Sequence, residues 1–354
     1  MVNTFADIIG NDRVKSYLTR MMEKEKIAQS MLFAGPDGVG KSLFAEYFAR
    51  LVLDTEKQHH PDLHIYRPQG KIGMHSIGSM RQFSREVYMA PFQAKRKVFI
   101  IHDAHRMLSY SANALLKTFE EPSLASVIIL LSSSPEQLLP TILSRCQKIR
   151  FFPIEHSDLV RFIQTRKDVP SDKASAIAYR ARGSIGQAVR ILEQENDPTR
   201  EILLQSLASG LLRSYSGVQQ VVKEINEQVT ILLKGGEEAI RSQLFQDFAE
   251  DLPAVQKHEI EKEVEGYLTM QRVVEASALF DIILSWARDL QLLHVNGNKN
   301  LLMNPDYETE LTQALQRGKL IPLEQLQEAI SEAKLALQRS TPLEYCLENL
   351  LLKI

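Results

Sequence analysis

Hydrophobic residues in the first 153 positions alternate between short continuous runs and amphipathic segments. Short apolar runs are typical of strands buried on both faces of a parallel sheet. Such runs lie at 31–33, 98–101 and 127–131. A further strand is expected at 149–152, and a short one after a histidine-containing loop at 59–62. Between them, helical spacing predicts helices at 11–24, 43–52, 76–88, 113–122 and 140–146. Alternating strands and helices predict a doubly wound α/β domain with a parallel sheet.

After residue 155 the pattern is helical, and no strand signal returns. Three short helices are predicted, separated by Pro170 and Gly183, at 158–166, 171–182 and 184–194. Leucines at three- and four-residue intervals predict longer helices at 217–233, 237–249, 259–294, 323–338 and 342–352. We therefore predict an α/β domain at 1–153, a small helical domain at 154–197 and an all-α domain at 198–354. The last carries an apolar stripe without a catalytic cluster, which favours a role in oligomerisation.

Length and composition agree with this division. A chain of 354 residues is too long for one compact core, and 44% hydrophobic with 24% charged residues excludes a disordered or fibrous protein. The net charge of −2 argues against a protein that holds DNA alone through its phosphates, since such proteins usually carry a basic excess. A role with nucleic acid would therefore be shared with partner subunits.

The chain also carries signals about its compartment. Cys146 and Cys346 lie far apart in a large chain, which is ordinary for a reducing cytoplasm and argues against a disulfide framework. No apolar run approaches the roughly 20 residues that cross a bilayer. The N-terminal sequence MVNTFADIIG lacks the basic start and the long apolar core of a signal peptide. We expect a soluble, cytoplasmic protein that does not act on a membrane.

The segment Gly35–Ser42, GPDGVGKS, fits the P-loop pattern G-x-x-x-x-G-K-[ST] completely. Glycines allow backbone N–H groups to surround phosphate oxygens, and the following helix adds a favourable dipole. Lys41 is expected to reach the β- and γ-phosphates, and Ser42 to offer a hydroxyl to Mg²⁺. The predicted ligand is ATP or ADP, with Mg²⁺ as a weak ligand of Ser42. The predicted nucleotide-binding residues are Gly35, Asp37, Gly38, Val39, Gly40, Lys41 and Ser42.

A short apolar turn, Phe5–Gly10, precedes the first predicted helix. Ile8 and Ile9 in this turn could pack against an adenine, and they could equally belong to the core. Both alternatives stay open at this point.

Four histidines fall close together, and they raise the question of a zinc site. His59, His60, His64 and His75 have no accompanying cysteine, and their spacing matches no usual ligand pattern. A run of solvated loop histidines is the commoner explanation, so zinc is not expected, although the sequence does not show whether any of them binds a metal.

Four stretches together resemble one family. They are Phe5–Gly10, GPDGVGKS, ANALLKTFEEP at 112–122 and LPTILSRC at 139–146. The first 190 residues resemble an AAA+ ATPase module, and the last two stretches are similar to those of bacterial DNA polymerase III clamp-loader subunits. Among these subunits the chain resembles delta prime. The resemblance implies that residues 1–153 are a P-loop AAA+ domain, residues 154–197 a helical lid and residues 198–354 a helical collar.

The resemblance also implies a role for Arg145. In the family this arginine reaches across a subunit interface to the γ-phosphate of a neighbour, where a guanidinium stabilises the charge on the transferred phosphoryl group. The alternative is an arginine in a structural ion pair. The flanking motif favours contact in trans.

Three departures from the family's active pattern bear on activity. The strand at 98–101 is followed by His102 and Asp103, where active modules carry two carboxylates, so Asp103 is the remaining candidate catalytic carboxylate and Mg²⁺ placement is compromised. The family's Gly-Ser-x-Arg motif falls on Gly183–Gly186, and Gly186 replaces its arginine. The cysteines of the family's zinc module are missing.

These features predict a clamp-loader subunit that completes a neighbour's ATPase site and hydrolyses ATP weakly or not at all. The resemblance implies motor (gamma/tau-like) and delta-like subunits, the sliding clamp and primer-template DNA as partners within the assembled DNA polymerase III complex. Two alternatives remain. One is an active AAA+ motor ATPase using Lys41, Ser42 and Asp103, and the other is a standalone DNA-binding AAA+ helicase loader.

Overall fold

The computed structural model divides into two compact units, Met1–Leu192 and Glu193–Ile354. It describes residues 5, 8–57, 59–69, 73–107, 112, 115–193, 197–246, 254–317, 320–339 and 341–353. The three-domain division predicted above differs from this pair of units in separating 154–197 from the sheet domain. Its boundaries stay a prediction.

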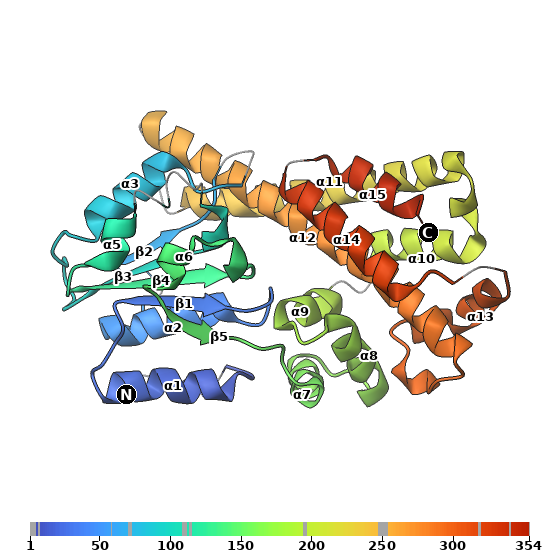
Figure 1. Ribbon diagram of the computed structural model, residues 1–354, viewed down its shortest axis with the longest axis horizontal. Coiled ribbons are helices and arrows are strands. Elements are labelled where there is room, and N and C mark those ends of the chain that lie inside the picture. Colours follow the sequence, from blue (N-terminus) through green and yellow to red (C-terminus); the bar gives the residue numbers. More distant parts are fainter. Residues whose placement is uncertain are drawn as a thin grey trace. The chain divides into compact units, whose positions relative to one another are not determined.

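The first unit is built on a five-stranded parallel sheet (Figure 1). The strands are β1 (Ser30–Ala34), β2 (Leu63–Tyr66), β3 (Lys97–Ile101), β4 (Ser126–Ser132) and β5 (Gln147–Arg150), in the order β2-β3-β4-β1-β5. The predicted fold class is confirmed. The bounds of β5 are a correction, because it begins two residues earlier than the strand predicted at 149–152. In this edge strand Ile149 is the one buried residue, so a continuous apolar run does not mark it.

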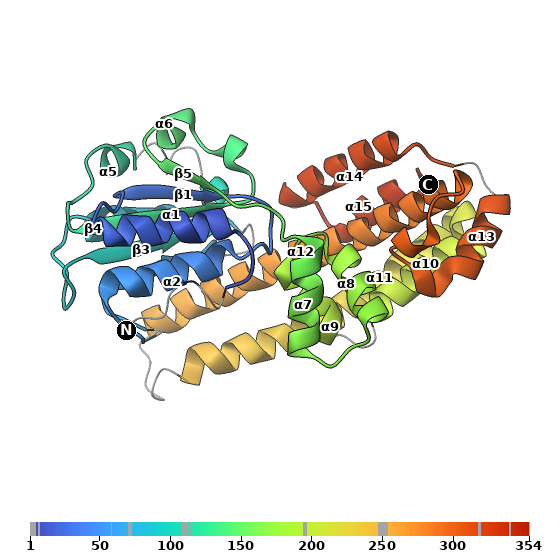
Figure 2. The same cartoon turned by 90° about the horizontal axis from the view of Figure 1, so that it is seen from below.

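Helices cover both faces of this sheet. One face packs against α1 (Asp12–Glu23) and α2 (Lys41–Leu53), and the other against α3 (Ile77–Glu86), α5 (Leu116–Glu120) and α6 (Pro140–Leu143). Figure 2 shows α1 and α2 in front of the strands. Successive strand residues point to opposite faces, so Leu32 and Phe33 enter different cores although both are fully buried. Burial on both faces explains why the inner strands β1, β3 and β4 are largely apolar, whereas the edge strand β2 is only partly buried.

A buried carboxylate fixes the loop that leads into β3. Asp62 is 0% exposed, and its two oxygens accept hydrogen bonds from the backbone N–H groups of Phe92, Gln93 and Ala94 at 2.6, 2.7 and 2.8 Å. Burial raises the pKa of Asp62, but these three donors together with His60 outweigh it and hold the pKa below its usual value. The sequence analysis did not identify this residue.

Residues after the sheet form a small helical group within the first unit. It consists of α7 (His156–Arg166), α8 (Ser171–Ala181) and α9 (Ile185–Glu193), close to the predicted bounds. These helices have an apolar core of their own, which includes Leu159, Ile163, Ala178 and Ala188. The core is separate from those that flank the sheet.

The second unit is helical in the part that the structure describes. Its helices are α10 (Pro198–Ser209), α11 (Tyr215–Gln246), α12 (Ala254–His294), α13 (Glu308–Arg317), α14 (Leu323–Gln338) and α15 (Leu343–Leu351). Short 3₁₀ helices occur in both units at Ala104–Arg106, Pro135–Gln137, Leu211–Arg213, Lys299–Leu301 and Pro305–Tyr307. α14 has the predicted bounds, whereas α10 and α13 were not predicted. Asp197 caps α10 through its side chain and Pro198 occupies the first turn, which are the usual signals of a helix start.

The continuity of α11 is a further correction. Two helices, 217–233 and 237–249, were predicted, but one helix runs through Gly235 and Gly236 to Gln246. Residues 247–249 lie outside the described residues. Each glycine in a helix interior costs about 1 kcal/mol relative to alanine. Apolar packing of α11 against α10, α12 and α15 outweighs that cost.

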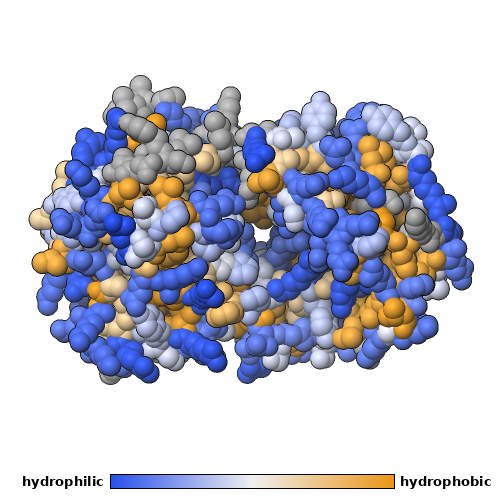
Figure 3. All heavy atoms as spheres, in the orientation of Figure 1, coloured by the Kyte–Doolittle hydropathy of each residue, from blue (hydrophilic) through white to orange (hydrophobic). Residues whose placement is uncertain are grey.

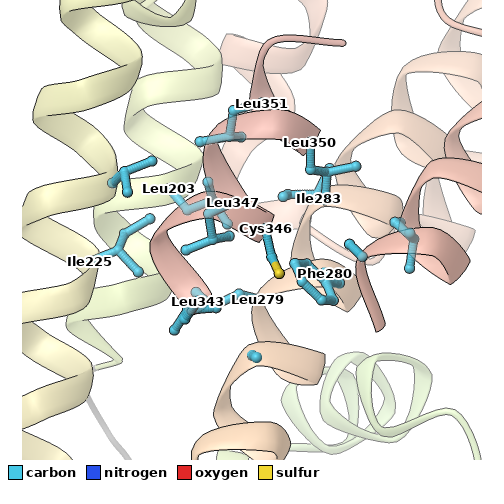
Figure 4. Close-up of a cluster of buried hydrophobic side chains, with 14 of the residues drawn as sticks. Leu203, Ile225, Leu279, Phe280, Ile283, Leu343, Cys346, Leu347, Leu350 and Leu351 are labelled. Carbon is cyan, nitrogen blue, oxygen red and sulfur yellow. The ribbon is translucent and has the colours of Figure 1, made fainter. Parts of the chain in front are cut away.

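The C-terminal helix α15 completes the core of the second unit. Figure 4 shows its side chains pointing among those of α10, α11 and α12. Leu343, Cys346, Leu347, Leu350 and Leu351 are at most 3% exposed. Their 3–4 residue spacing matches the stripe from which the helix was predicted.

The surface is mixed in character. On the face drawn in Figure 3, hydrophilic side chains cover much of the surface and hydrophobic ones form scattered patches. Among the residues that the structure describes, none of the helices combines the length and the apolar character needed to span a bilayer.

Candidate functional site

The P-loop follows β1 directly and leads into α2, as predicted. Gly38 and Gly40 have φ values of +74° and +99°, a region that favours glycine, and Gly40 is the residue before the first turn of α2. Val39 is 1% exposed and packs into the core beneath the loop. The loop backbone therefore turns tightly at the N-terminus of a helix, which is a geometry that binds phosphate.

The ammonium of Lys41 lies inside the loop. Its Nζ donates to the carbonyl oxygens of Gly35 and Pro36, each at 2.6 Å, and lies 3.7 Å from Oδ1 of Asp37. Burial lowers the pKa of Lys41, and the carboxylates of Asp37 and Asp103 partly oppose this shift. Ser42, the predicted Mg²⁺ ligand, is the second residue of α2, and Asp37 is largely exposed.

The small helical group contacts the P-loop through backbone atoms. The N–H of Gly186 donates to the carbonyl of Gly38 at 3.2 Å, and a Cβ on Gly38 would lie 2.0 Å from Oγ of Ser184. These residues belong to the segment where the family carries a Gly-Ser-x-Arg motif. Gly186 therefore stands directly beside the P-loop and brings no side chain to it.

His102 and Asp103 follow β3, and their side chains have different surroundings. Asp103 has a left-handed φ of +45° and interacts electrostatically with Asp37, Arg106 and Lys41. Burial, reinforced by Asp37, raises the pKa of the Asp103 carboxyl, and Arg106 and Lys41 partly oppose this. The Asp103 carboxylate thus lies on the P-loop side.

The His102 imidazole lies elsewhere. Burial, with Arg67 and His75 nearby, lowers its pKa to about 3, so it is neutral. Its Nε2 has no hydrogen-bond partner among the described residues. The groups that perturb its pKa do not include any residue of the P-loop, and a neutral imidazole lacks the charge with which a carboxylate would hold magnesium.

Two polar residues near the P-loop were missed in the sequence analysis. Nδ1 of His105 lies 3.1 Å from Oγ of Ser132, and Asp37 and Lys41 are among the charges that act on this imidazole. Burial, followed by Arg106, lowers the pKa of His105 to about 4. Ser132 ends β4 and pairs with Ala34, the last residue of β1. Because parallel strands end at the same edge of a sheet, this convergence could have been inferred from the strand order.

Arg145 lies just after α6. Its Nη1 donates to the carbonyl of Thr141 at 2.9 Å and to Oγ of Ser144 at 3.3 Å, and its Nη2 forms an ion pair with Glu120. One third of the side chain is exposed. The ion-pair alternative is therefore formed within this chain, and contact in trans stays a prediction.

The position of Arg145 relative to its own P-loop follows from strand register. Arg145 precedes Gln147, which pairs with Met31 at the start of β1, whereas the P-loop follows Ala34 at the end of β1. Three strand residues span roughly 10 Å. Arg145 and the P-loop thus lie toward opposite edges of the parallel sheet.

The N-terminal turn links two cores of the first unit. Ile8 is 5% exposed and belongs to the core of the α1 and α2 face, whereas Ile9 packs against the core of the small helical group. Ile8 therefore fits the core alternative. Contact of either residue with an adenine stays a prediction. Ala6 and Asp7 of the same turn, and Asn113 and Ala114 of the ANALLKTFEEP stretch, lie outside the described residues.

The expectation of solvated histidines is wrong for three of the four. The His60 side chain is only 11% exposed, and its Nδ1 accepts from the N–H of Asp62 at 3.1 Å. His75 is fully buried, and its Nε2 lies 2.6 Å from the His102 carbonyl oxygen. His64 stacks on Phe99 and pairs through Nδ1 with Glu86 at 3.2 Å. These histidines are held by apolar neighbours and polar partners from other parts of the fold. The composition of the loop alone does not predict such contacts. Among the described residues no three His, Cys, Asp or Glu side chains are grouped so as to hold a metal.

The first unit contains the segment that matches a known protein family. Residues 10–155 match the family model described as DNA polymerase III, delta subunit. The DNA polymerase III subunit delta' of Bacillus subtilis is 32% identical over 160 residues, which cover 40% of this chain and 48% of that protein. Subunit gamma of Buchnera aphidicola is 26% identical over 209 residues, covering 53% and 58%. The chain spans about half the length of these curated relatives.

Two solved structures also resemble parts of this chain. A DNA polymerase III gamma subunit-related protein from Thermotoga maritima has a TM-score of 0.44 and 17% identity, over 92% of this chain and 99% of its own. The RuvB Holliday junction branch migration motor of the same organism has a TM-score of 0.42 and 20% identity, over 57% and 65%.

Proposed function

We propose that this chain belongs to the bacterial DNA polymerase III clamp-loader family, and that it acts as a delta-prime-like subunit that supplies Arg145 to a nucleotide held by a neighbouring subunit. One observation carries this proposal. Arg145 is partly exposed and lies toward the N-terminal ends of the strands, whereas its own P-loop lies at their C-terminal ends, so another chain can approach its guanidinium more readily than its own nucleotide can.

The chain's own nucleotide site supports a binding role rather than efficient hydrolysis. Gly186 brings no cationic side chain to the P-loop. His102 interacts with Arg67 and His75, which leaves Asp103 as the carboxylate on the P-loop side. Hydrolysis of ATP depends on positioned charge around the transferred phosphoryl group, and this site lacks two such groups.

The residues present fit a bound ATP or ADP. The glycine-rich backbone at the N-terminus of α2 and the ammonium of Lys41 form a cradle for phosphate oxygens. Mg²⁺ prefers oxygen ligands, and Ser42 with Asp103 would supply them, so any metal would be held through these two and the phosphates. The chain's own contribution is to bind and orient the phosphates.

As partners we propose the motor and delta-like subunits of a clamp loader, the sliding clamp, and primer-template DNA reached through the assembled complex. The second unit is proposed as the oligomerisation module, because its apolar helices carry no grouped catalytic residues in the described part.

The test is the ATPase activity of the assembled clamp loader containing Arg145→Ala in this subunit. We expect that activity to fall by about 10³-fold at the site next to this chain, because a guanidinium supplied in trans is worth about 10³ to 10⁵ in rate. Assembly, measured by size-exclusion chromatography, should be unchanged. Complex activity equal to that of the wild type would refute the proposal.

A second candidate, an active motor ATPase, is favoured by one observation, that Asp103 lies close enough to Lys41 to perturb its pKa. It predicts that the purified chain hydrolyses ATP with Mg²⁺ and that Lys41→Ala abolishes this turnover. The standalone helicase loader would bind primed DNA by itself in a salt-dependent way.

A further inference from the structure

The second unit contains a cavity of about 200 Å³ between its helices. α10, α12, α13 and α14 contribute to its wall, together with the segment between α10 and α11. The wall is largely apolar and includes Leu207, Ile283, Trp286 and Leu290. An apolar cavity with a few polar groups is the usual form of a ligand site.

Two arginines supply the charge of this wall. Among the described residues that line the cavity, Arg213 and Arg317 are charged and none is acidic. Nη2 of Arg213 donates to the carbonyl of Arg317 at 2.8 Å, and Arg317 donates to the carbonyl of Ala208 and to Oε1 of Gln313, both at 3.4 Å. These acceptors are all neutral. Neither arginine pairs with a carboxylate in the part of the chain that the structure describes.

The size of the cavity limits what it can hold. An apolar cavity of about 150 Å³ binds a benzene molecule, so about 200 Å³ fits an apolar group of roughly eight carbon atoms. A guanidinium pairs with carboxylates through charge-assisted hydrogen bonds, which are stronger beside apolar surface than in water. An apolar cavity with two arginines in its wall therefore favours a ligand that has an apolar chain and an anionic group at one end.

We propose that this cavity binds a short apolar group ending in a carboxylate, with its carboxylate held by Arg213 and Arg317. Two sources supply that chemistry, a free medium-chain fatty acid and the C-terminal apolar residue of a protein chain. This inference stands independently of the role proposed for Arg145.

Trp286 provides a direct reporter, because it lines the cavity and is the one tryptophan of the sequence. The full chain is titrated with octanoate while tryptophan fluorescence is recorded, and calorimetry measures the affinity. Saturable binding is expected for octanoate and not for octylamine, which has the same chain and the opposite charge. Equal binding of both, or binding of neither octanoate nor the peptide acid described below, overturns the proposal.

Variants distinguish the site from nonspecific association. The double variant R213A/R317A should bind octanoate at least 10-fold more weakly, and Ala314→Phe, which fills the cavity while keeping both arginines, should do the same. Arg272→Ala, in an exposed arginine of α12 that does not line the cavity, is the matched control and should bind as the wild type does. Unchanged affinity in both cavity variants would contradict the assignment, provided that circular dichroism shows them folded.

A peptide pair separates the two sources. A short peptide ending in leucine is compared as its free acid and as its C-terminal amide. Tighter binding of the acid than of octanoate supports a protein terminus as the occupant, and tighter binding of octanoate supports a fatty acid.

Discussion

Arg145 and Glu120 form an ion pair that joins the end of α6 to the end of α5. Both side chains are one third to one half exposed, so the pair contributes about 0–1 kcal/mol to stability. Nη1 of Arg145 donates to Thr141 and Ser144. Glu120 binds Nη2 and so orients the guanidinium, and breaking this ion pair would cost little free energy.

Glu120→Ala should release this guanidinium. If Arg145 serves a neighbour's nucleotide, removing a competing carboxylate raises the ATPase rate of the assembled complex by up to about 5-fold, the equivalent of about 1 kcal/mol. The free energy of unfolding should change by less than about 1 kcal/mol. Steady-state ATPase assays and urea titration measure the two effects. A rate that falls to the level of Arg145→Ala would instead assign Glu120 a supporting role.

Gly38→Ala should weaken both the fold and nucleotide binding. Its φ of +74° is strained for alanine, and the added Cβ would lie 2.0 Å from Oγ of Ser184. We expect a loss of about 1–2 kcal/mol in unfolding free energy, and a lower affinity for ADP by calorimetry. Gly235→Ala is the matched control. It lies inside α11 with open space around its Cβ position, so it should stabilise the chain by about 0.5–1 kcal/mol.

Lys41→Met should remove most nucleotide affinity while leaving the chain folded. The ammonium holds the carbonyls of Gly35 and Pro36, and charge-assisted bonds to a phosphate contribute about 1.5–3 kcal/mol, or about 10- to 150-fold in Kd. Isothermal titration with ADP and ATP measures the loss. Undiminished affinity would show that the P-loop does not hold the phosphates through this residue.

Acid should destabilise the first unit through its buried histidines. The pKa of His75 is lowered to about 4 by burial, against 6.5 in an exposed site. Between these two values the unfolded chain binds more protons than the folded chain, so the unfolding free energy falls as pH decreases from 6.5 toward 4. The slope from one such group is at most about 1.4 kcal/mol per pH unit.

The measurement is urea unfolding between pH 7 and pH 4.5. His75→Gln keeps a donor for the His102 carbonyl and removes the titrating group, so its stability should depend less on pH. His59→Gln, in an exposed histidine, provides the control. An identical slope in His75→Gln and wild type would contradict the assignment.

The sheet and the P-loop were predictable because their signals are local. The inner strands β1, β3 and β4 are largely apolar because both their faces are buried, and the glycines of GPDGVGKS mark positions where φ is positive. The edge strand β5 lacks that double burial, which is why its predicted bounds were two residues late. Substitutions at the site, such as Gly186 for an arginine, were equally visible because they fall on fixed motif positions.

Features set by tertiary contacts were not predictable in this way. The three backbone N–H groups that bind Asp62 lie about thirty residues further along the chain. The imidazole of His75 binds the carbonyl of His102, just after β3. The glycine pair in α11 resembles a helix break, but the helix is held on both sides of it, by the apolar core up to Leu233 and by the ion pair of Arg241 with Glu261 of α12. In each case long-range packing outweighs the local preference.

The hydrogen bond from Gly186 to Gly38 has a consequence for how the first unit responds to a ligand. It connects the start of α9 to the P-loop through main-chain atoms alone. A rearrangement of the loop backbone that moves the Gly38 carbonyl would break this hydrogen bond unless the first turn of α9 moves with it. No side chain takes part in the bond, so it persists through substitutions that leave both glycines and their backbone conformations in place.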